Sequence, residues 1–208
     1  TVLSRGLGDV YKRQKEYKPL TLKQHWNSDH MRSVRRRMMA GEELKECEVC
    51  DHKLLNTDVY RSYWNQLFKD RIDEAFEKTD DTGKTSMKTI SFDYRFNNLC
   101  NFKCRMCGDM LSSSWEAESR KNKTWKKDES PWMASPLREQ IKTFQDKQVV
   151  QEFVDSIETK EIREIYWCGG EPLMWDMHWK AMERIIELGF ADQVYVCLLY
   201  TSDAADES

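Results

Sequence analysis

The sequence lacks any long hydrophobic run. No uninterrupted apolar stretch among its 208 residues approaches the roughly 20 residues that a membrane-spanning helix needs. A secretory signal, with its charged start and apolar centre, is lacking as well. We therefore expect a cytoplasmic protein that has no membrane partner.

An excess of positive charge is also lacking. The chain has 33 lysines and arginines against 36 aspartates and glutamates, and its net charge of -3 exerts no global attraction on nucleic acid or acidic membranes. The basic residues around Val34 and around Trp125 are therefore interpreted as solvated surface, and nucleic acid is not an expected partner. With 39% hydrophobic and 12% aromatic residues, the chain can form a core and is not a disordered protein.

Cysteine, by contrast, is plentiful. Seven cysteines in a cytoplasmic chain indicate metal or redox chemistry before disulfides, because the cytosol keeps thiols reduced. Cys168 and Cys197 stand alone in apolar, strand-like runs, and we predict that they are small buried hydrophobic residues. The other five form two tight groups: Cys47 and Cys50 with C-x2-C spacing, and Cys100, Cys104 and Cys107 with C-x3-C-x2-C spacing.

The group of three cysteines has the donor set of an iron–sulfur cluster with an open site. Three thiolates within eight positions can hold one cluster and leave one iron without a protein ligand. Such an iron can bind and reductively cleave a ligand, whereas a cluster closed by four cysteines carries electrons. A structural zinc site needs a fourth donor, and the nearest histidine, His52, lies far back along the chain. Two alternatives stay open, an electron-transfer protein with closed clusters and a zinc-structured binding protein.

The first part of the chain has a helical pattern. Ser28 or Asp29 is expected to cap a helix that ends at Gly41. A second helix is expected over 57–78, with an apolar stripe that forms core. The polar segment 80–84 has the composition of a turn, and we place the domain boundary there.

The later part of the chain alternates between strand and helix. Alternating apolar and polar residues over 90–96 predict a strand. Its polar face, with Asp93 and Arg95, fits either a parallel strand that lines a barrel interior or an exposed antiparallel strand. The order that follows is typical of a parallel sheet, with helices expected over 109–121, 146–158 and 176–188 and strands over 162–168 and 194–199.

Two motifs follow neighbouring strands of this predicted sheet. The cysteine loop follows the strand over 90–96, and the turn Gly169-Gly170-Glu171-Pro172 follows the strand over 162–168. Because ligands gather at the carboxyl ends of parallel strands, both motifs are expected at one rim. Consecutive glycines let a backbone approach a ligand closely, and a glutamate can accept a charge-assisted hydrogen bond from an ammonium group.

The three-cysteine loop, with Phe102 and Met106 inside it and Gly-Gly-Glu-Pro downstream, resembles the radical S-adenosylmethionine (SAM) superfamily. The resemblance implies that SAM chelates the open iron of a 4Fe-4S cluster and that one electron splits SAM into methionine and a 5′-deoxyadenosyl radical, which abstracts a substrate hydrogen. It also implies a reductant such as flavodoxin or ferredoxin. Met106 departs from the aromatic residue that is usual at its position. The implied cluster ligands are Cys100, Cys104 and Cys107, and the implied SAM-binding residues are Met106 near the adenine and Gly169, Gly170 and Glu171 around the amino group.

The earlier pair of cysteines carries a second resemblance. Cys47 and Cys50, with the preceding segment 38–46, resemble the auxiliary-cluster segment of twitch or SPASM-type members, and the pair precedes the barrel as in some phage-associated members. The resemblance implies a second iron–sulfur cluster and a peptide or protein substrate. Taken alone, the pair fits a zinc site or a redox dithiol equally well, with His52 as a substitute ligand or as a surface residue.

Together these features predict an α/β fold: the N-terminal part of a partial (β/α) TIM-like radical SAM barrel over 85–197, preceded by a mainly helical auxiliary-cluster segment over 15–84. The ends, 1–14 and 198–208, resemble translated adaptor sequence and are set aside as artefacts. We therefore expect a natural gene truncated at both ends. The chain by itself is expected to be inactive or poorly folded, although its parent is an enzyme.

Overall fold

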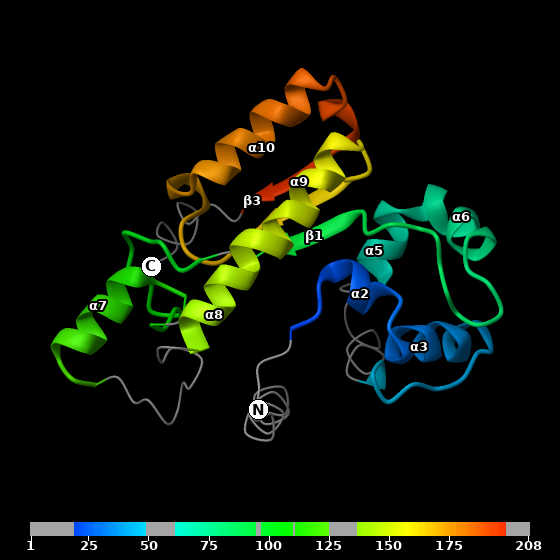
Figure 1. Ribbon diagram of the computed structural model, residues 1–208, viewed down its shortest axis with the longest axis horizontal. Coiled ribbons are helices and arrows are strands. Elements are labelled where there is room, and N and C mark those ends of the chain that lie inside the picture. Colours follow the sequence, from blue (N-terminus) through cyan, green and yellow to red (C-terminus); the bar gives the residue numbers. More distant parts are fainter. Residues whose placement is uncertain (1–18, 49–60, 95–96, 110, 125–136, 199–208) are drawn as a thin grey trace. The chain divides into compact units, whose positions relative to one another are not determined.

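The computed structural model describes residues 19–48, 61–94, 97–109, 111–124 and 137–198. The chain divides into two compact units, Leu20–Thr89 and the part from Ile90 onward (Figure 1). None of the helices within the described ranges has the length and apolar character that crossing a bilayer requires.

The first unit is helical and begins with two capped helices. Helix α2 (Leu22–Trp26) starts with a capping box, in which Thr21 and Gln24 exchange hydrogen bonds between side chain and backbone. Helix α3 (Asp29–Met39) is capped by Ser28, whose hydroxyl accepts from the backbone N–H of Met31. Gly41 follows its end with a positive φ of 71°. The predicted cap and end of this helix are confirmed.

The second predicted helix is interrupted. Helix α5 (Arg61–Leu67) and helix α6 (Ile72–Glu77) are separated by Phe68 and the 3-10 turn η1 (Lys69–Arg71). The tighter turn changes the angle between successive side chains, so the apolar positions no longer share one face. The prediction of a core stripe was wrong, because the side chains of Trp64, Ile72 and Phe76 are 36%, 41% and 60% exposed.

A turn closes the first unit. The carboxylate of Asp80 accepts backbone hydrogen bonds from Thr82 and Lys84, which confirms the expected turn. Beyond it, Asn27 forms a reciprocal pair of hydrogen bonds with the backbone of Thr85, at 2.9 and 3.0 Å. The turn therefore lies inside the first unit, and the division between the units falls between Thr89 and Ile90.

The second unit is a three-stranded parallel sheet with helical connections. The strands β1 (Ser91–Tyr94), β2 (Glu164–Trp167) and β3 (Tyr195–Leu198) pair in the order β1-β2-β3, and this described sheet is not closed into a barrel. The mixed α/β class and the parallel sheet are thus confirmed, and the antiparallel alternative for the first strand is excluded. The connections contain α7 (Ser113–Lys121), α8 (Leu137–Phe144), the π-helix η3 (Gln145–Val149), α9 (Val150–Glu158), η4 (Pro172–Met174), α10 (Asp176–Glu187) and η5 (Ala191–Gln193).

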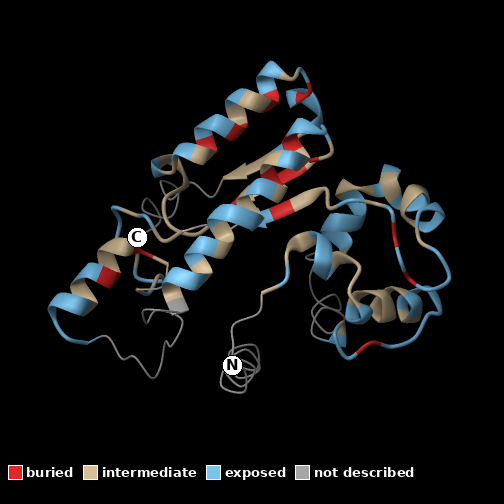
Figure 2. Cartoon of the chain, in the orientation of Figure 1, coloured by how far each residue is buried: buried red, intermediate tan, exposed pale blue. Residues whose placement is uncertain are grey.

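One face of this sheet forms the core. Phe92 of β1 and Ile165 of β2 are partners in the register, and both are buried. Phe153 of α9 packs edge-on against Phe92 and against Trp167, with ring centroids 5.6 and 5.8 Å apart. Figure 2 shows the buried residues along β1, β2, α9 and α10. The helices thus cover the apolar face, which explains the alternation seen in the sequence.

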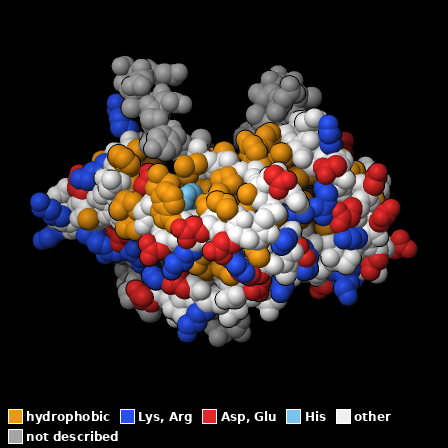
Figure 3. Space-filling model, turned by 90° about the horizontal axis from the view of Figure 1, so that it is seen from above, with side chains coloured by type: hydrophobic (Ala, Val, Ile, Leu, Met, Phe, Trp, Pro, Cys, Tyr) orange, Lys and Arg blue, Asp and Glu red, His pale blue; other side chains and the backbone are white. Residues whose placement is uncertain are grey.

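The opposite face of the sheet is polar. Ser91 and Asp93 of β1 pair in register with Glu164 and Tyr166 of β2; the predicted neighbour Arg95 lies outside the described residues. On the face of the molecule seen in the space-filling view, acidic and basic side chains lie side by side, and apolar side chains are also exposed (Figure 3). This face therefore carries charges of both signs, as the balanced composition predicts.

Candidate cofactor site

The cysteine loop follows β1, and the start of α7 holds its backbone. The hydroxyl of Ser113 accepts from the N–H of Cys100 and also donates to the Cys100 carbonyl, both at 3.0 Å. Ser114 donates to the same carbonyl at 2.8 Å, and Ser112 donates to the carbonyl of Phe102 at 2.7 Å. Three consecutive serines therefore fix the first half of the loop.

The second half of the loop is held by side chains of the same helix. The indole N–H of Trp115 donates to the carbonyl of Cys104 at 3.0 Å. Lys103 lies over the Trp115 ring and forms an ion pair with Glu118. The backbone N–H of Cys107 donates to the carbonyl of Cys104, which makes a turn between the two cysteines. These α7 contacts were not predicted from the sequence, although a run of serines before a helix is a recognisable capping signal.

The three thiols of the loop lie near one another without converging. Burial raises the pKa of Cys107, and the neighbouring thiols of Cys104 and Cys100 raise that pKa further. The sulfur of Cys100 accepts a hydrogen bond from the backbone N–H of Phe102 at 3.3 Å. Among the described residues, no three histidine, cysteine, aspartate or glutamate side chains are arranged so that they can hold a metal ion. The structure thus places the three predicted ligands on one loop but does not bring their sulfurs to one point.

The glycine turn after β2 contacts the cysteine loop directly. Gly170 has a φ of 66°, and a Cβ atom there would lie 2.5 Å from the carbonyl oxygen of Leu99. That same carbonyl accepts from the N–H of Glu171 at 2.7 Å, and the carbonyl of Leu111 accepts from the N–H of Gly170 at 3.2 Å. The turn is therefore hydrogen-bonded to the residues that flank the cysteine loop on both sides. Only glycine fits at position 170.

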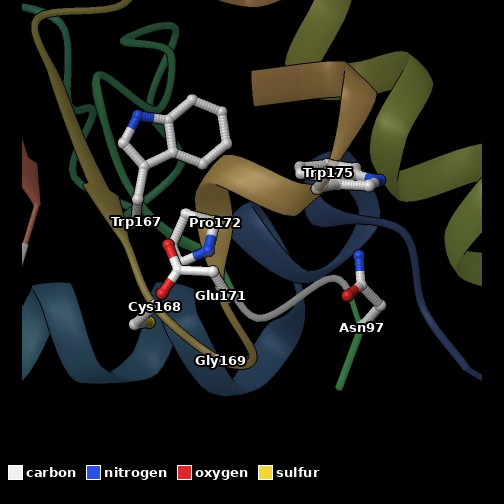
Figure 4. Close-up of a pocket in the computed structure, with 7 residues that line it drawn as sticks. All are labelled: Asn97, Trp167, Cys168, Gly169, Glu171, Pro172 and Trp175. Carbon is white, nitrogen blue, oxygen red and sulfur yellow. The ribbon is translucent and has the colours of Figure 1, made fainter. Parts of the chain in front are cut away.

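A small pocket lies beside this turn. Figure 4 shows the residues that line it, which are Asn97, Trp167, Cys168, Gly169, Glu171, Pro172 and Trp175. The carboxylate of Glu171 also accepts a hydrogen bond from the backbone N–H of Leu173 at 3.3 Å and so begins η4. The pocket volume is about 10 Å³, enough for about one water molecule. Of the predicted SAM-binding residues, Gly169 and Glu171 line this pocket, whereas Gly170 and Met106 do not, and Met106 is 87% exposed.

Trp167, which lines the pocket, packs against a buried histidine of α10. The rings of Trp167 and His178 are 4.6 Å apart, and both residues are buried. Their Nε1 and Nδ1 atoms have no hydrogen-bond partner among the described residues. Burial lowers the pKa of His178, and the charge of Glu171 partly offsets that effect. The sequence contained no signal for this pair beyond the position of His178 in a helix.

The isolated cysteines are less buried than predicted. Cys168 and Cys197 are both only half-buried. The thiol of Cys168 donates to the carboxylate of Asp93 at 2.6 Å, because both side chains lie on the polar face of the sheet. The prediction that they are buried hydrophobic residues was therefore wrong.

The earlier cysteine pair is described only in part. Cys47 is half-buried, and its backbone N–H donates to the carbonyl of Leu44 at 2.8 Å. Cys50 and His52 lie outside the described residues. The predicted auxiliary-cluster ligands consequently remain a prediction.

Comparisons of the chain with protein-family models, with curated proteins and with solved structures found no match.

Proposed function

We propose that this chain is the cluster-binding and SAM-binding part of a radical SAM enzyme. The observation that carries the proposal is the direct contact between the two motifs. Glu171 donates its N–H to the carbonyl of Leu99, and Gly170 has no Cβ where one would meet that carbonyl. A cluster on the cysteine loop and a SAM molecule on the glycine turn would therefore be neighbours.

The donor chemistry of the loop fits the proposed cluster. Three thiolates from one loop suit a 4Fe-4S cluster with one open iron, and the ligands in this proposal are Cys100, Cys104 and Cys107. The N–H of Phe102 already donates to the Cys100 sulfur, a contact of the kind that tunes cluster potentials. When bound and reduced by a flavodoxin or ferredoxin, the cluster would supply the electron that cleaves SAM to the hydrogen-abstracting 5′-deoxyadenosyl radical.

The glycine turn supplies the proposed SAM contacts. The half-buried carboxylate of Glu171 faces the pocket, where it can accept a charge-assisted hydrogen bond from the SAM ammonium group. Gly169 and Gly170, which both have positive φ angles and no side chain, let a ligand approach the backbone beside Glu171. Met106 is exposed and could therefore pack against an adenine. Because the pocket accommodates about one water molecule, the rest of SAM would bind outside it.

The remaining parts of the proposal concern the surroundings of this site. We infer that the open parallel sheet corresponds to the first strands of a TIM-like barrel, with the polar face of Asp93, Glu164 and Tyr166 inside. We also infer that Cys47 and Cys50 hold a second, auxiliary cluster, and that the substrate is a peptide or protein. The polar face supports the first inference. Parallel strands that are buried on both faces are usually apolar on both, so a polar face suggests that these strands line an interior that holds a site.

Metal analysis after anaerobic reconstitution tests the cluster assignment. The chain is incubated with iron and sulfide under reducing conditions without zinc, desalted, and analysed for iron and acid-labile sulfide. We expect iron and sulfide to bind in equal amounts, as a 4Fe-4S cluster requires. The variant Cys104→Ala removes one of three ligands and is expected to lose most of the iron at this site.

Cys197→Ala is the matched control, because it removes a half-buried thiol of the same unit that is not a proposed ligand. It is expected to retain the iron content of the unaltered chain. A chain that takes up neither iron nor sulfide at the three-cysteine loop would contradict the proposed function. Equal iron loss in both variants would contradict the assignment of Cys104 as a ligand.

A further inference from the structure

A buried carboxylate ties the cysteine loop to two helices. Glu116 of α7 is only 7% exposed, although glutamate is rarely buried unless it is paired. Its oxygens accept from Arg138 of α8, from Arg120 one turn along α7, and from Asn98 of the cysteine loop. The contacts with Asn98 Nδ2 and Arg138 Nη2 measure 2.7 and 2.9 Å. Burial by itself would raise the pKa of Glu116, but these hydrogen bonds outweigh it and hold that pKa at about 2.

Asn98 connects this carboxylate to both ends of the loop. Its side-chain amide donates to Glu116 and, at 3.3 Å, to the carbonyl of Asp109 after the last cysteine. Its backbone carbonyl accepts from the N–H of Ser113 at 2.6 Å. Asn98 lies two residues before Cys100 and Asp109 two residues after Cys107, so the network closes the loop outside its proposed ligands.

The fold does not need the buried charge of Glu116 for its stability. A buried ion pair is often no more stabilising than apolar side chains of the same shape, because taking the charges out of water is unfavourable. What the network provides is geometry, since a planar carboxylate with several donors accepts them in only a few arrangements. The contacts therefore fix where the loop begins and ends relative to α7 and α8.

We propose that Glu116 is a positioning residue that acts through Asn98 to hold the cysteine loop in the backbone conformation that receives the cluster. This inference rests on the proposed function. With the ends of the loop fixed, only the three cysteine side chains must rearrange around the cluster, and the backbone is already ordered when binding occurs. Glu116 itself does not touch the cluster, SAM or the substrate in this proposal.

Amide hydrogen exchange of the metal-free chain tests the positioning role without any cofactor. Glu116→Gln keeps the shape of the side chain and removes its charge. We expect the amides of 98–109, including Cys100 and Cys107, to exchange about tenfold faster, the factor for loss of roughly one charge-assisted hydrogen bond. Amides of β2, α9 and α10 are expected to exchange at unchanged rates.

Glu158→Gln is the matched control. Glu158 of α9 accepts two hydrogen bonds from Arg184 of α10, each at 2.7 Å, so this change removes a paired carboxylate of the same unit away from the loop. It should leave exchange of 98–109 unaltered. Asn98→Ala is the second variant, because it removes the side-chain hydrogen bonds of Asn98 to Glu116 and to Asp109 and leaves the Glu116–Arg138 pair in place. It should accelerate amide exchange of 98–109 about as much as Glu116→Gln does. Because the Glu116–Arg138 pair stays in place, it also tests the positioning role if Glu116→Gln fails to fold.

Cluster retention provides the second readout. After reconstitution, Glu116→Gln and Asn98→Ala are expected to lose iron to a chelator about tenfold faster than Glu158→Gln. Unchanged loop exchange in Asn98→Ala would overturn the positioning role even if the chain binds iron normally. Accelerated exchange in a chain that takes up no iron would instead overturn the proposed function and leave Glu116 as an anchor of the loop.

Discussion

Single residues join the two motifs. Gly170 combines a backbone conformation that disfavours other residues with a contact that leaves no room for a side chain. A Gly-Gly turn after a strand was recognisable in the sequence, but its contact with Leu99 was not. The sequence places the two motifs on neighbouring strands, whereas the hydrogen bond between them depends on the exact course of the loop.

Replacing Gly170 tests this contact. Gly170→Ala would set a Cβ 2.5 Å from the Leu99 carbonyl oxygen, in a backbone region that is strained for alanine. We expect the free energy of unfolding to fall by about 2 to 4 kcal/mol, as measured by urea denaturation. Gly189→Ala is the control, because Gly189 has a φ of 70° and open space around it. It should lose only about 1 kcal/mol, and equal losses in both variants would show that the contact contributes nothing.

At the scale of elements, periodicity was informative and side-chain contacts were not. The strand expected over 162–168 is β2, Glu164–Trp167, and the helix expected over 176–188 is α10, Asp176–Glu187. Strong apolar periods made both recognisable. The helix expected from 109 begins only after Ser112, whose hydroxyl caps it and also contacts the loop. Sequence spacing does not reveal such a partner, because a hydroxyl can bond to any nearby carbonyl.

The pairing of β1 with β2 contains a buried acid that predicts a pH dependence. Burial raises the pKa of Glu164 above its ordinary value of 4.5, although the Ser91 hydroxyl, 2.5 Å away, opposes this and Asp93 adds to it. The folded chain therefore keeps this proton to a higher pH than the unfolded chain. Its contribution to stability is greatest below pH 4.5 and is lost as the pH rises through the folded pKa.

Glu164→Gln tests that sign. The amide keeps an oxygen for the Ser91 hydroxyl and carries no charge to bury. We expect it to increase the free energy of unfolding at pH 7 by about 1 kcal/mol and to change it little near pH 4. Urea denaturation at the two pH values measures the difference, with the exposed Glu183→Gln of α10 as the control. A variant that is less stable at pH 7 than the unaltered chain would contradict the argument.

At the scale of the whole molecule, a helical unit precedes an open α/β unit. The order of helix, strand and helix was predictable because each element has its own period. The exposure of Trp64 and Phe76 was not, because burial depends on how a helix is interrupted and on what packs against it. The spacing of the three cysteines was enough to place them on one loop. The directions of their side chains could not be predicted, because they depend on the loop backbone, which hydrogen bonds from α7 hold in place.

Electron paramagnetic resonance of the reduced, reconstituted chain can show whether SAM binds the cluster. We propose that the cysteine loop holds a cluster with one open iron beside the glycine turn, so that SAM binds that iron. The spectrum is recorded after dithionite reduction, with and without SAM, and S-adenosylhomocysteine serves as the matched additive that lacks the sulfonium methyl group. We expect a reduced 4Fe-4S signal whose shape and g values change when SAM is added. A reduced cluster whose spectrum is the same with and without SAM would contradict this proposal and would indicate a closed, electron-transferring cluster.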